Sequence, residues 1–157
     1  MAKRLDRDQI ETWRAFLDAR ALIVGAIERD LTTAGMPPTS WYEVLWTLER
    51  AHEGRMRIHE LADAVLLSRS GLSRLLDRME SESLLIRTTC PSDRRGAFAV
   101  ITVTGSAALR DMWPIYERSI AQHFLPQLGE DAETLRSALA RAAGSARRGS
   151  PEGIRAA

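Results

Sequence analysis

The sequence predicts a mainly α-helical fold with one small β-hairpin. Long stretches at both ends repeat apolar residues every three or four positions, which is the period of a helix that buries one side. Residues 84–103 instead contain two short β-prone runs around a turn-rich segment. The length of 157 residues suits one domain, or two small ones that share a core.

The first predicted helix covers residues 7–34. Its apolar positions run at helical spacing from Ile10 through Val24 to Leu31. The Gly-Met-Pro-Pro sequence at 35–38 ends it, because proline lacks the N–H that a helix needs and restricts the residue before it. So wide an apolar stripe has little to pack against in a small monomer, which predicts packing on the C-terminal helices or on a second subunit.

A second helix is predicted to open near Thr39, where Ser40 and Glu43 have the spacing of a capping box. It is rich in aromatic residues in a chain that is only 6% aromatic. They are Trp41, Tyr42 and Trp46. The helix is expected to end near residues 51–54.

Two short helices follow within residues 56–80, and the second has two chemically different faces. Ser68 suits its N-cap, because the hydroxyl can accept from a free N–H of the first turn. One face is apolar and consists of Leu72, Leu75, Leu76 and Met79. The opposite face carries Ser70, Ser73, Arg74 and Asp77. Serine and arginine can bind base edges in a major groove, although an ordinary amphipathic helix would present the same face to solvent.

The predicted hairpin begins at Leu84 and returns over residues 98–103. Its turn, residues 90–96, contains the Pro, Ser, Asp and Gly that favour turns, together with Arg94 and Arg95. Asp93 lies two residues before Arg95 and can brace its guanidinium. A braced arginine on a narrow tip suits a minor groove, where negative potential attracts it. The alternative is an ordinary polar hairpin tip.

These elements, in this order, resemble the winged helix-turn-helix of the MarR family of bacterial regulators. The matching residues are Glu60-Leu61-Ala62, Leu67-Ser68-Arg69-Ser70, Ser73-Arg74-Leu75-Leu76-Asp77-Arg78-Met79-Glu80 and Asp93-Arg94-Arg95-Gly96. The outer helices also match in order and length. The resemblance implies a short strand at residues 55–57 that joins the hairpin, and a dimer that the outer helices form across a twofold axis.

One position departs from the family pattern. Members commonly have glycine just before the hairpin, where this chain has Ser83. Glycine ends helices at low cost in a left-handed conformation. Ser83 therefore either adopts that conformation or ends the helix differently.

A third long helical segment starts near residue 104, and Pro126 and Gly129 interrupt it before a last helix at residues 131–143. The predicted fold is thus a winged helix-turn-helix flanked by N- and C-terminal dimerisation helices. We expect residues 1–35 and 104–147 to be the dimerisation helices, residues 39–103 the DNA-binding region, and residues 148–157 a flexible tail.

Composition and motifs give no indication of an enzyme. The sequence contains no phosphate-binding glycine loop, nucleophile elbow or paired-histidine zinc motif. We expect no catalytic residue, cofactor or metal. The formal net charge is only +1, so the DNA prediction depends on architecture rather than on charge.

The predicted compartment is the cytoplasm. The N-terminus lacks the apolar core of a signal peptide, and no apolar run is long enough to span a membrane. Cys90 is the only cysteine, which excludes an intramolecular disulfide and fits a reducing compartment. Its place in the hairpin turn leaves a redox function open.

The predicted function is a homodimeric, sequence-specific transcriptional regulator that binds an inverted repeat in double-stranded DNA. Nine residues are assigned to DNA contact: Ser68, Arg69, Ser70, Ser73, Arg74, Arg78, Asp93, Arg94 and Arg95. The alternative is a winged-helix module for protein–protein contact, which would be expected to expose apolar anchors on the same face.

The resemblance also implies a small-molecule effector. We expect an aromatic ligand that releases a repressor, although the residues do not separate a repressor from an activator. The candidate ligand-binding residues are Trp13, Phe16, Arg20, Trp41, Tyr42, Trp46 and His52. The alternative is that these aromatic side chains only fill the core.

Overall fold

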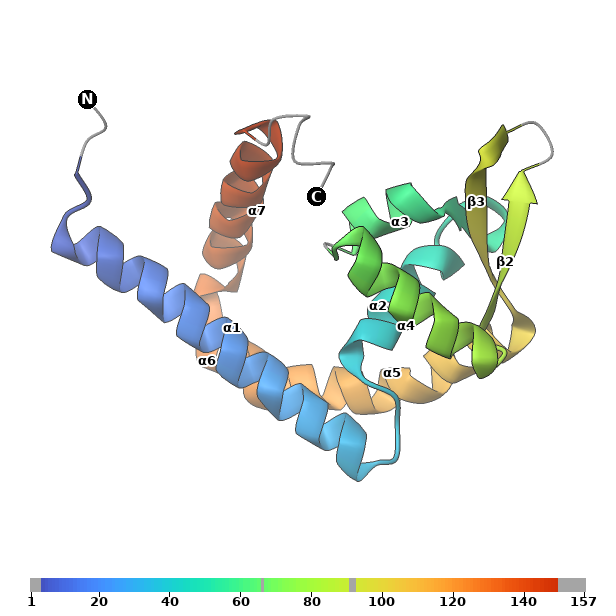
Figure 1. Cartoon of the computed structure of the whole chain (residues 1–157). Coiled ribbons are helices and arrows are strands. Elements are labelled where there is room, and N and C mark those ends of the chain that lie inside the picture. Colours follow the sequence, from blue (N-terminus) through green and yellow to red (C-terminus); the bar gives the residue numbers. More distant parts are fainter. Residues whose placement is uncertain (1–3, 66, 91–92, 150–157) are drawn as a thin grey trace.

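The computed structural model describes residues 4–65, 67–90 and 93–149, with the backbone alone at residues 69, 90, 93–95 and 147–149. Figure 1 shows a winged helix-turn-helix on one side and long helical arms on the other. The helices and strands, in chain order, are α1 (Arg7–Thr33), α2 (Thr39–Glu49), η1 (His52–Gly54), β1 (Arg55–Arg57), α3 (Ile58–Ala64), α4 (Arg69–Ser81), β2 (Leu85–Cys90), β3 (Asp93–Ile101), α5 (Val103–His123), α6 (Leu125–Leu128), η2 (Gly129–Asp131) and α7 (Ala132–Gly149).

The three strands form one antiparallel sheet in the order β1-β3-β2. Arg55 pairs with Val100 and Leu85 pairs with Ile101, so β3 is the central strand. This confirms the short strand that the family resemblance implied at residues 55–57. The sheet closes the end of a core built from α2, α3, α4 and the start of α5.

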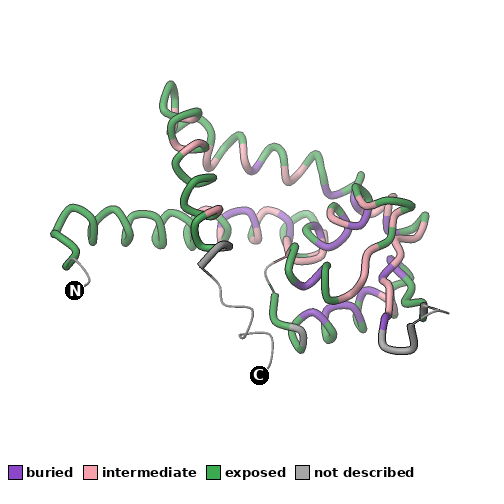
Figure 2. Tube along the Cα trace, turned by 90° about the horizontal axis from the view of Figure 1, so that it is seen from above, coloured by how far each residue is buried: buried purple, intermediate pink, exposed green. Residues whose placement is uncertain are grey.

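The helical arms consist of α1, the C-terminal part of α5, α6 and α7, and they contain little of that core. α1 packs along α5, but its buried residues all lie in its C-terminal third, at Ala26, Ile27 and Leu31. Residues 4–22 are exposed along their whole length, as the green stretch from the N-terminus in Figure 2 shows. α7 stands across from this half of α1 and away from the winged helix (Figure 1).

The capping box predicted at Ser40 and Glu43 is wrong. α2 begins at Thr39, and no side chain of its own first turn caps it. Glu28 of α1 does so instead: its Oε1 accepts from the backbone N–H of Thr39 at 3.1 Å and also from the Thr39 hydroxyl. The acceptor that α2 needs therefore comes from another helix, which a local sequence pattern cannot reveal.

The last helix is longer than predicted. It extends to Gly149 rather than ending at residue 143, so it includes the first two residues of the predicted tail, while residues 150–157 lie outside the described residues. Alanine and arginine, which dominate residues 138–148, are strong helix formers and offset the single Gly144.

Ser83 adopts the conformation that glycine usually supplies. Its φ is 59°, in the left-handed region. The N–H of Leu84 donates to Met79 O at 3.0 Å and the N–H of Ser83 donates to Glu80 O at 2.9 Å, which is the bond pattern of a Schellman motif. The Thr102 hydroxyl donates to Ser83 O at 2.6 Å and supports the strained residue. The first of the two alternatives at this position is therefore correct.

Candidate nucleic-acid interface

The two faces of α4 are separated in the structure as the sequence predicts. Ser68 is the N-cap, and its hydroxyl accepts from the N–H of Gly71 at 3.1 Å. Four apolar side chains are buried against the core: Leu72, Leu75, Leu76 and Met79. The exposed face carries Ser70, Ser73, Arg74, Asp77 and Arg78. Burial of the apolar face fixes the rotation of the helix, so the hydroxyls and guanidiniums must face solvent.

The hairpin of β2 and β3 stands beside α4 and forms the wing (Figure 1). Leu84 and Leu85 are buried at its base, while Ile86, Thr88 and Thr89 are exposed further along. The Asp93–Arg95 brace and the assignments to Arg69 and Arg94 concern side chains that lie outside the described residues, as does the redox question at Cys90.

The wing is joined to α4 by a network of ion pairs centred on Arg87. This guanidinium lies 2.7 Å from Asp77 and 2.6 Å from Glu80. Hydrogen bonds from Arg87 hold the pKa of Glu80 below its usual value, and the same bonds raise the pKa of Arg87. Glu80 and Arg87 are therefore charged at neutral pH.

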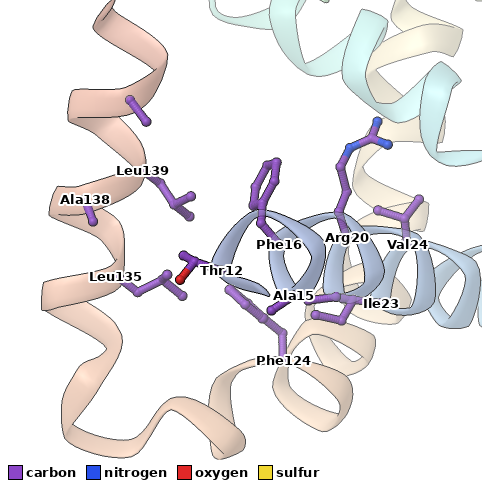
Figure 3. Close-up of a pocket in the computed structure, with 12 residues that line it drawn as sticks. Thr12, Ala15, Phe16, Arg20, Ile23, Val24, Phe124, Leu135, Ala138 and Leu139 are labelled. Carbon is purple, nitrogen blue, oxygen red and sulfur yellow. The ribbon is translucent and has the colours of Figure 1, made fainter. Parts of the chain in front are cut away.

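A groove of about 710 Å³ lies between the N-terminal half of α1 and helix α7. Figure 3 shows Phe16 and Arg20 of α1 on one wall and Leu135 and Leu139 of α7 on the other, with Phe124 at the bottom. Its lining is almost wholly apolar. Phe16 and Leu139 remain 41% and 39% exposed, so one chain leaves much of this apolar surface uncovered.

The seven predicted ligand-binding residues fall into three places. Trp13, Phe16 and Arg20 lie on the exposed half of α1, with the rings of Trp13 and Phe16 5.7 Å apart. Trp41 and Tyr42 lie at the start of α2. Trp46 is exposed further along α2, beneath the guanidinium of Arg50, and His52 is exposed in η1.

Of these seven residues, Tyr42 contacts aromatic side chains of another helix among the described residues. Tyr42 stacks on Tyr116 at 4.4 Å between ring centroids and on Trp113 at 6.2 Å, both from α5. The indole Nε1 of Trp41 is buried without a hydrogen-bond partner among the described residues. Burial raises the pKa of Glu43, whose carboxylate accepts from the Tyr116 hydroxyl at 3.5 Å. Burial, reinforced by Glu43, raises the pKa of Tyr116 to about 12.

Comparisons with known proteins identify the family. A model of the MarR family matches residues 34–96. AbsC from Streptomyces coelicolor, a MarR family transcriptional regulator, is 35% identical over 93% of this chain and 99% of its own, with a TM-score of 0.82. The chain belongs to the MarR family.

Two further MarR-type proteins are similar to the chain. Sco3205 from Streptomyces coelicolor, whose structure is in complex with DNA, is 27% identical over 93% of this chain and 91% of its own, with a TM-score of 0.83. The regulator MhqR of Bacillus subtilis (strain 168) is 35% identical over 55% of this chain. That match spans only 57% of MhqR.

Membership of the MarR family confirms two predictions: the winged helix-turn-helix fold, and a transcriptional regulator rather than an enzyme. Among the described residues, no three histidine, cysteine or acidic side chains gather as a metal site, and no helix is long and apolar enough to cross a membrane.

Trp113, Tyr116 and Arg87 were not predicted as site residues. Trp113 and Tyr116 lie in a helical stripe that resembles any core face, and nothing local to Arg87 identifies its partners.

Proposed function

We propose that this MarR family member is a homodimeric, sequence-specific DNA-binding regulator, with α4 in the major groove and the wing over the adjacent minor groove. The observation that carries the proposal is the exposed face of α4, where Ser70, Ser73, Arg74 and Arg78 project opposite four buried apolar residues. No large apolar side chain is exposed within α4 itself, which favours DNA over a protein partner.

The groove between α1 and α7 supports the homodimer. Further apolar side chains are exposed in residues 7–22 of α1: Trp13 at 57%, Leu17 at 43% and Leu22 at 72%. Apolar surface on this scale is unusual in a monomer and marks an interface. A second copy with the same arms would cover it through a twofold contact, which would place two α4 helices about 34 Å apart for successive major grooves.

The aromatic contact between α2 and α5 supports the ligand part of the proposal. It joins the DNA-binding part to an arm, so a molecule bound there can favour one arrangement of the two over another. We propose a repressor that an aromatic ligand releases. The carboxylate of Glu43 favours a phenol, which can donate a hydrogen bond, over an aromatic acid. We also assign to this ligand the indole Nε1 of Trp41, a buried donor without a partner among the described residues.

Tryptophan fluorescence tests the ligand. Titration with matched phenols and benzoic acids should give a saturable change for a phenol, and the same phenol should weaken binding to the operator. Tyr116→Phe should reduce that response, because it removes the hydroxyl beside Glu43. Absence of a response to every aromatic compound would show that the aromatic side chains only fill the core.

Binding isotherms on selected and scrambled duplexes, at two salt concentrations, test the DNA interface. Arg74→Ala should weaken specific binding by roughly 1–3 kcal/mol per half-site and relax the base preference, as for an arginine that binds guanine. Arg78→Ala should weaken all sequences alike and reduce the salt dependence. Arg95→Ala should weaken sites with A·T-rich flanks most. Wild-type behaviour of both Arg74→Ala and Arg95→Ala would overturn this interface.

A further inference from the structure

The three-stranded sheet has two chemically different faces. Side chains alternate between the faces along each strand, and directly opposite residues on neighbouring strands share a face. Ala99 is buried and pairs with Met56 on one side and with Arg87, which reaches α4, on the other, so these three residues lie on the inner face. The outer face carries two cross-strand triplets, which are Arg55, Val100 and Ile86, and Arg57, Phe98 and Thr88.

The middle of the outer face is apolar and only partly covered. Ile86 is 48% exposed, and Phe98 and Val100 are half-buried. A sheet face that meets only water usually carries polar residues instead. The proposed DNA contacts use α4 and the tip of the wing, and the proposed dimer uses the arms, which Figure 1 shows at the other end of the molecule. The outer face therefore has no part in either of those functions.

Two arginines of β1 border the apolar centre. The guanidinium carbon of Arg57 lies 5.1 Å from the centroid of the Phe98 ring, and that of Arg55 lies 5.5 Å from the same centroid. A guanidinium that stacks on a ring uses its flat face, and the N–H groups at its edge keep the geometry that suits a carboxylate. Both arginines are thus held in place before a partner arrives, which lowers the entropy cost of binding.

The charge of the outer face limits the chemistry of a partner. Neither triplet contains an acidic residue. Glu53 adjoins the face and lies 2.7 Å from Arg55 Nη2, with the two side chains 58% and 51% exposed. An ion pair as exposed as this contributes little, so an incoming carboxylate can replace Glu53 at small cost. The face therefore presents positive charge beside an apolar centre.

We propose that the outer face of the sheet is a docking surface for a protein, and that it binds an acidic segment that carries a large apolar side chain. The apolar side chain covers Ile86 and Val100, while neighbouring carboxylates bind Arg55 and Arg57. Arginine beside aromatic and apolar residues is the composition of a protein interface. A nucleic acid has the negative charge but would leave the apolar centre uncovered. The inference goes beyond DNA binding and dimer formation and depends on neither.

Peptide display on the full-length protein tests the docking surface. A random peptide library is selected on the wild type, and peptides that also bind Ile86→Glu are removed, because this variant places a carboxylate on the apolar centre. Peptides that occupy the groove between α1 and α7 bind both proteins and are removed at this step. The remaining peptides should carry Asp or Glu next to a large apolar residue. If no peptide remains, or the remaining ones have no excess of acidic residues, the docking surface is wrong.

Fluorescence polarisation of one labelled synthetic peptide from this selection assigns the contacts. A double variant, Arg55→Gln with Arg57→Gln, should weaken binding about tenfold and remove most of its salt dependence, because two ion pairs are lost. It leaves the apolar centre unchanged, so this test holds even if Ile86→Glu does not fold. The matched control Arg110→Gln removes an exposed arginine of α5 and should bind as the wild type does.

A charge exchange shows whether the contact is direct. A peptide with lysine in place of its acidic residues should bind the wild type more weakly than it binds Arg55→Glu with Arg57→Glu. Equal affinity of the acidic peptide for the wild type and for the double glutamine variant would overturn the proposal.

Binding to a scrambled duplex distinguishes a nucleic acid as the occupant. The double glutamine variant should keep the wild-type salt slope, since neither arginine is assigned to a phosphate. A slope smaller by about 2 per chain would show that both arginines contact phosphates. That result would overturn the protein partner and assign the face to nucleic acid.

Discussion

The winged helix and the arms bury very different shares of their apolar residues. In the winged helix, Leu45, Leu61, Leu76 and Leu85 are fully buried by the chain's own side chains. In the exposed part of α1 before Ile23, Leu22 is 72% exposed, and Trp13, Phe16 and Leu17 are exposed as well. Figure 2 shows the contrast, with the buried residues gathered in the winged helix and exposed residues along the arms.

The two regions look alike in the sequence, because each has apolar residues at helical spacing. The difference teaches that such a stripe shows that a helix needs a partner surface but does not say which chain supplies it. The winged helix finds that surface within the chain. The arms leave about 710 Å³ of apolar groove between α1 and α7, which a second copy is proposed to fill.

The same substitution in the two regions should give the largest contrast. Leu45→Ala removes a fully buried side chain of α2 and should lower the free energy of unfolding by about 2–5 kcal/mol, because it leaves a cavity. Leu22→Ala, in the exposed half of α1, should cost less than about 0.5 kcal/mol in the dissociated chain. Urea unfolding at low protein concentration measures both, and equal losses would contradict the comparison.

Two glycine-to-alanine substitutions, one in each region, should have opposite effects on the stability of the protein. A Cβ at Gly105 would lie 2.0 Å from the carbonyl oxygen of Leu84, where the start of α5 crosses the base of the wing. Gly105→Ala should therefore destabilise the protein by about 1–3 kcal/mol or more. Gly25 in α1 has open space around it apart from a 3.6 Å contact with Arg29. Gly25→Ala should stabilise the helix by up to about 1 kcal/mol. Thermal unfolding measures both variants. A Gly105→Ala midpoint temperature equal to or above that of the wild type would show that the crossing at Gly105 can relax.

Phe16→Glu tests whether the arms are needed for association of two chains but not for folding of the winged helix. It places a charge in the apolar groove and should weaken association at least about tenfold, or roughly 1.4 kcal/mol, because the charge would lose its hydration. Sedimentation equilibrium should show a shift from about twice the chain mass of 17.5 kDa towards one chain, with the helical content of the winged helix retained.

Ile86→Glu is the matched control, since Ile86 is also an exposed apolar residue, at 48%, but lies in the wing. It should leave association unchanged. A wild-type protein that sediments as one chain would contradict the dimer, and equal loss of association by both variants would contradict the assignment of the interface to the arms.

The smallest expected effect concerns the contact between α1 and α5. Asp30 accepts from the Ser119 hydroxyl at 2.6 Å and lies 3.0 Å from His123 Nε2, and these two hydrogen bonds lower its pKa. A depressed carboxyl pKa contributes stability that is present above the unfolded pKa of 3.8 and is lost as the pH falls through the folded value. Asp30→Asn should therefore be slightly less stable than the wild type near pH 6, with the two unfolding curves converging below about pH 3. Curves that remain parallel down to that pH would show that the charge of Asp30 does not contribute.

Much of the candidate interface could be predicted from the sequence because it is local. Ser68 as N-cap, the buried face of α4 and the exposed position of Arg74 all follow from helical spacing within about twelve residues. The hairpin follows from β-prone runs on either side of a turn. The cap that Glu28 provides for α2, the stacking of Tyr42 on Tyr116 and the network at Arg87 join residues that are 7 to 74 positions apart. No local pattern contains these contacts.

By itself, the sequence determined the order of the elements, the two faces of α4 and the presence of unsatisfied apolar stripes at both ends, since each depends on the period of the backbone. Only the tertiary structure decided which stripes the chain covers and which it leaves open. It also decided that Ser83 takes a left-handed conformation and that Arg87 joins the wing to α4. These outcomes depend on how distant segments meet in space, and burial and ion pairing exist only after they have met.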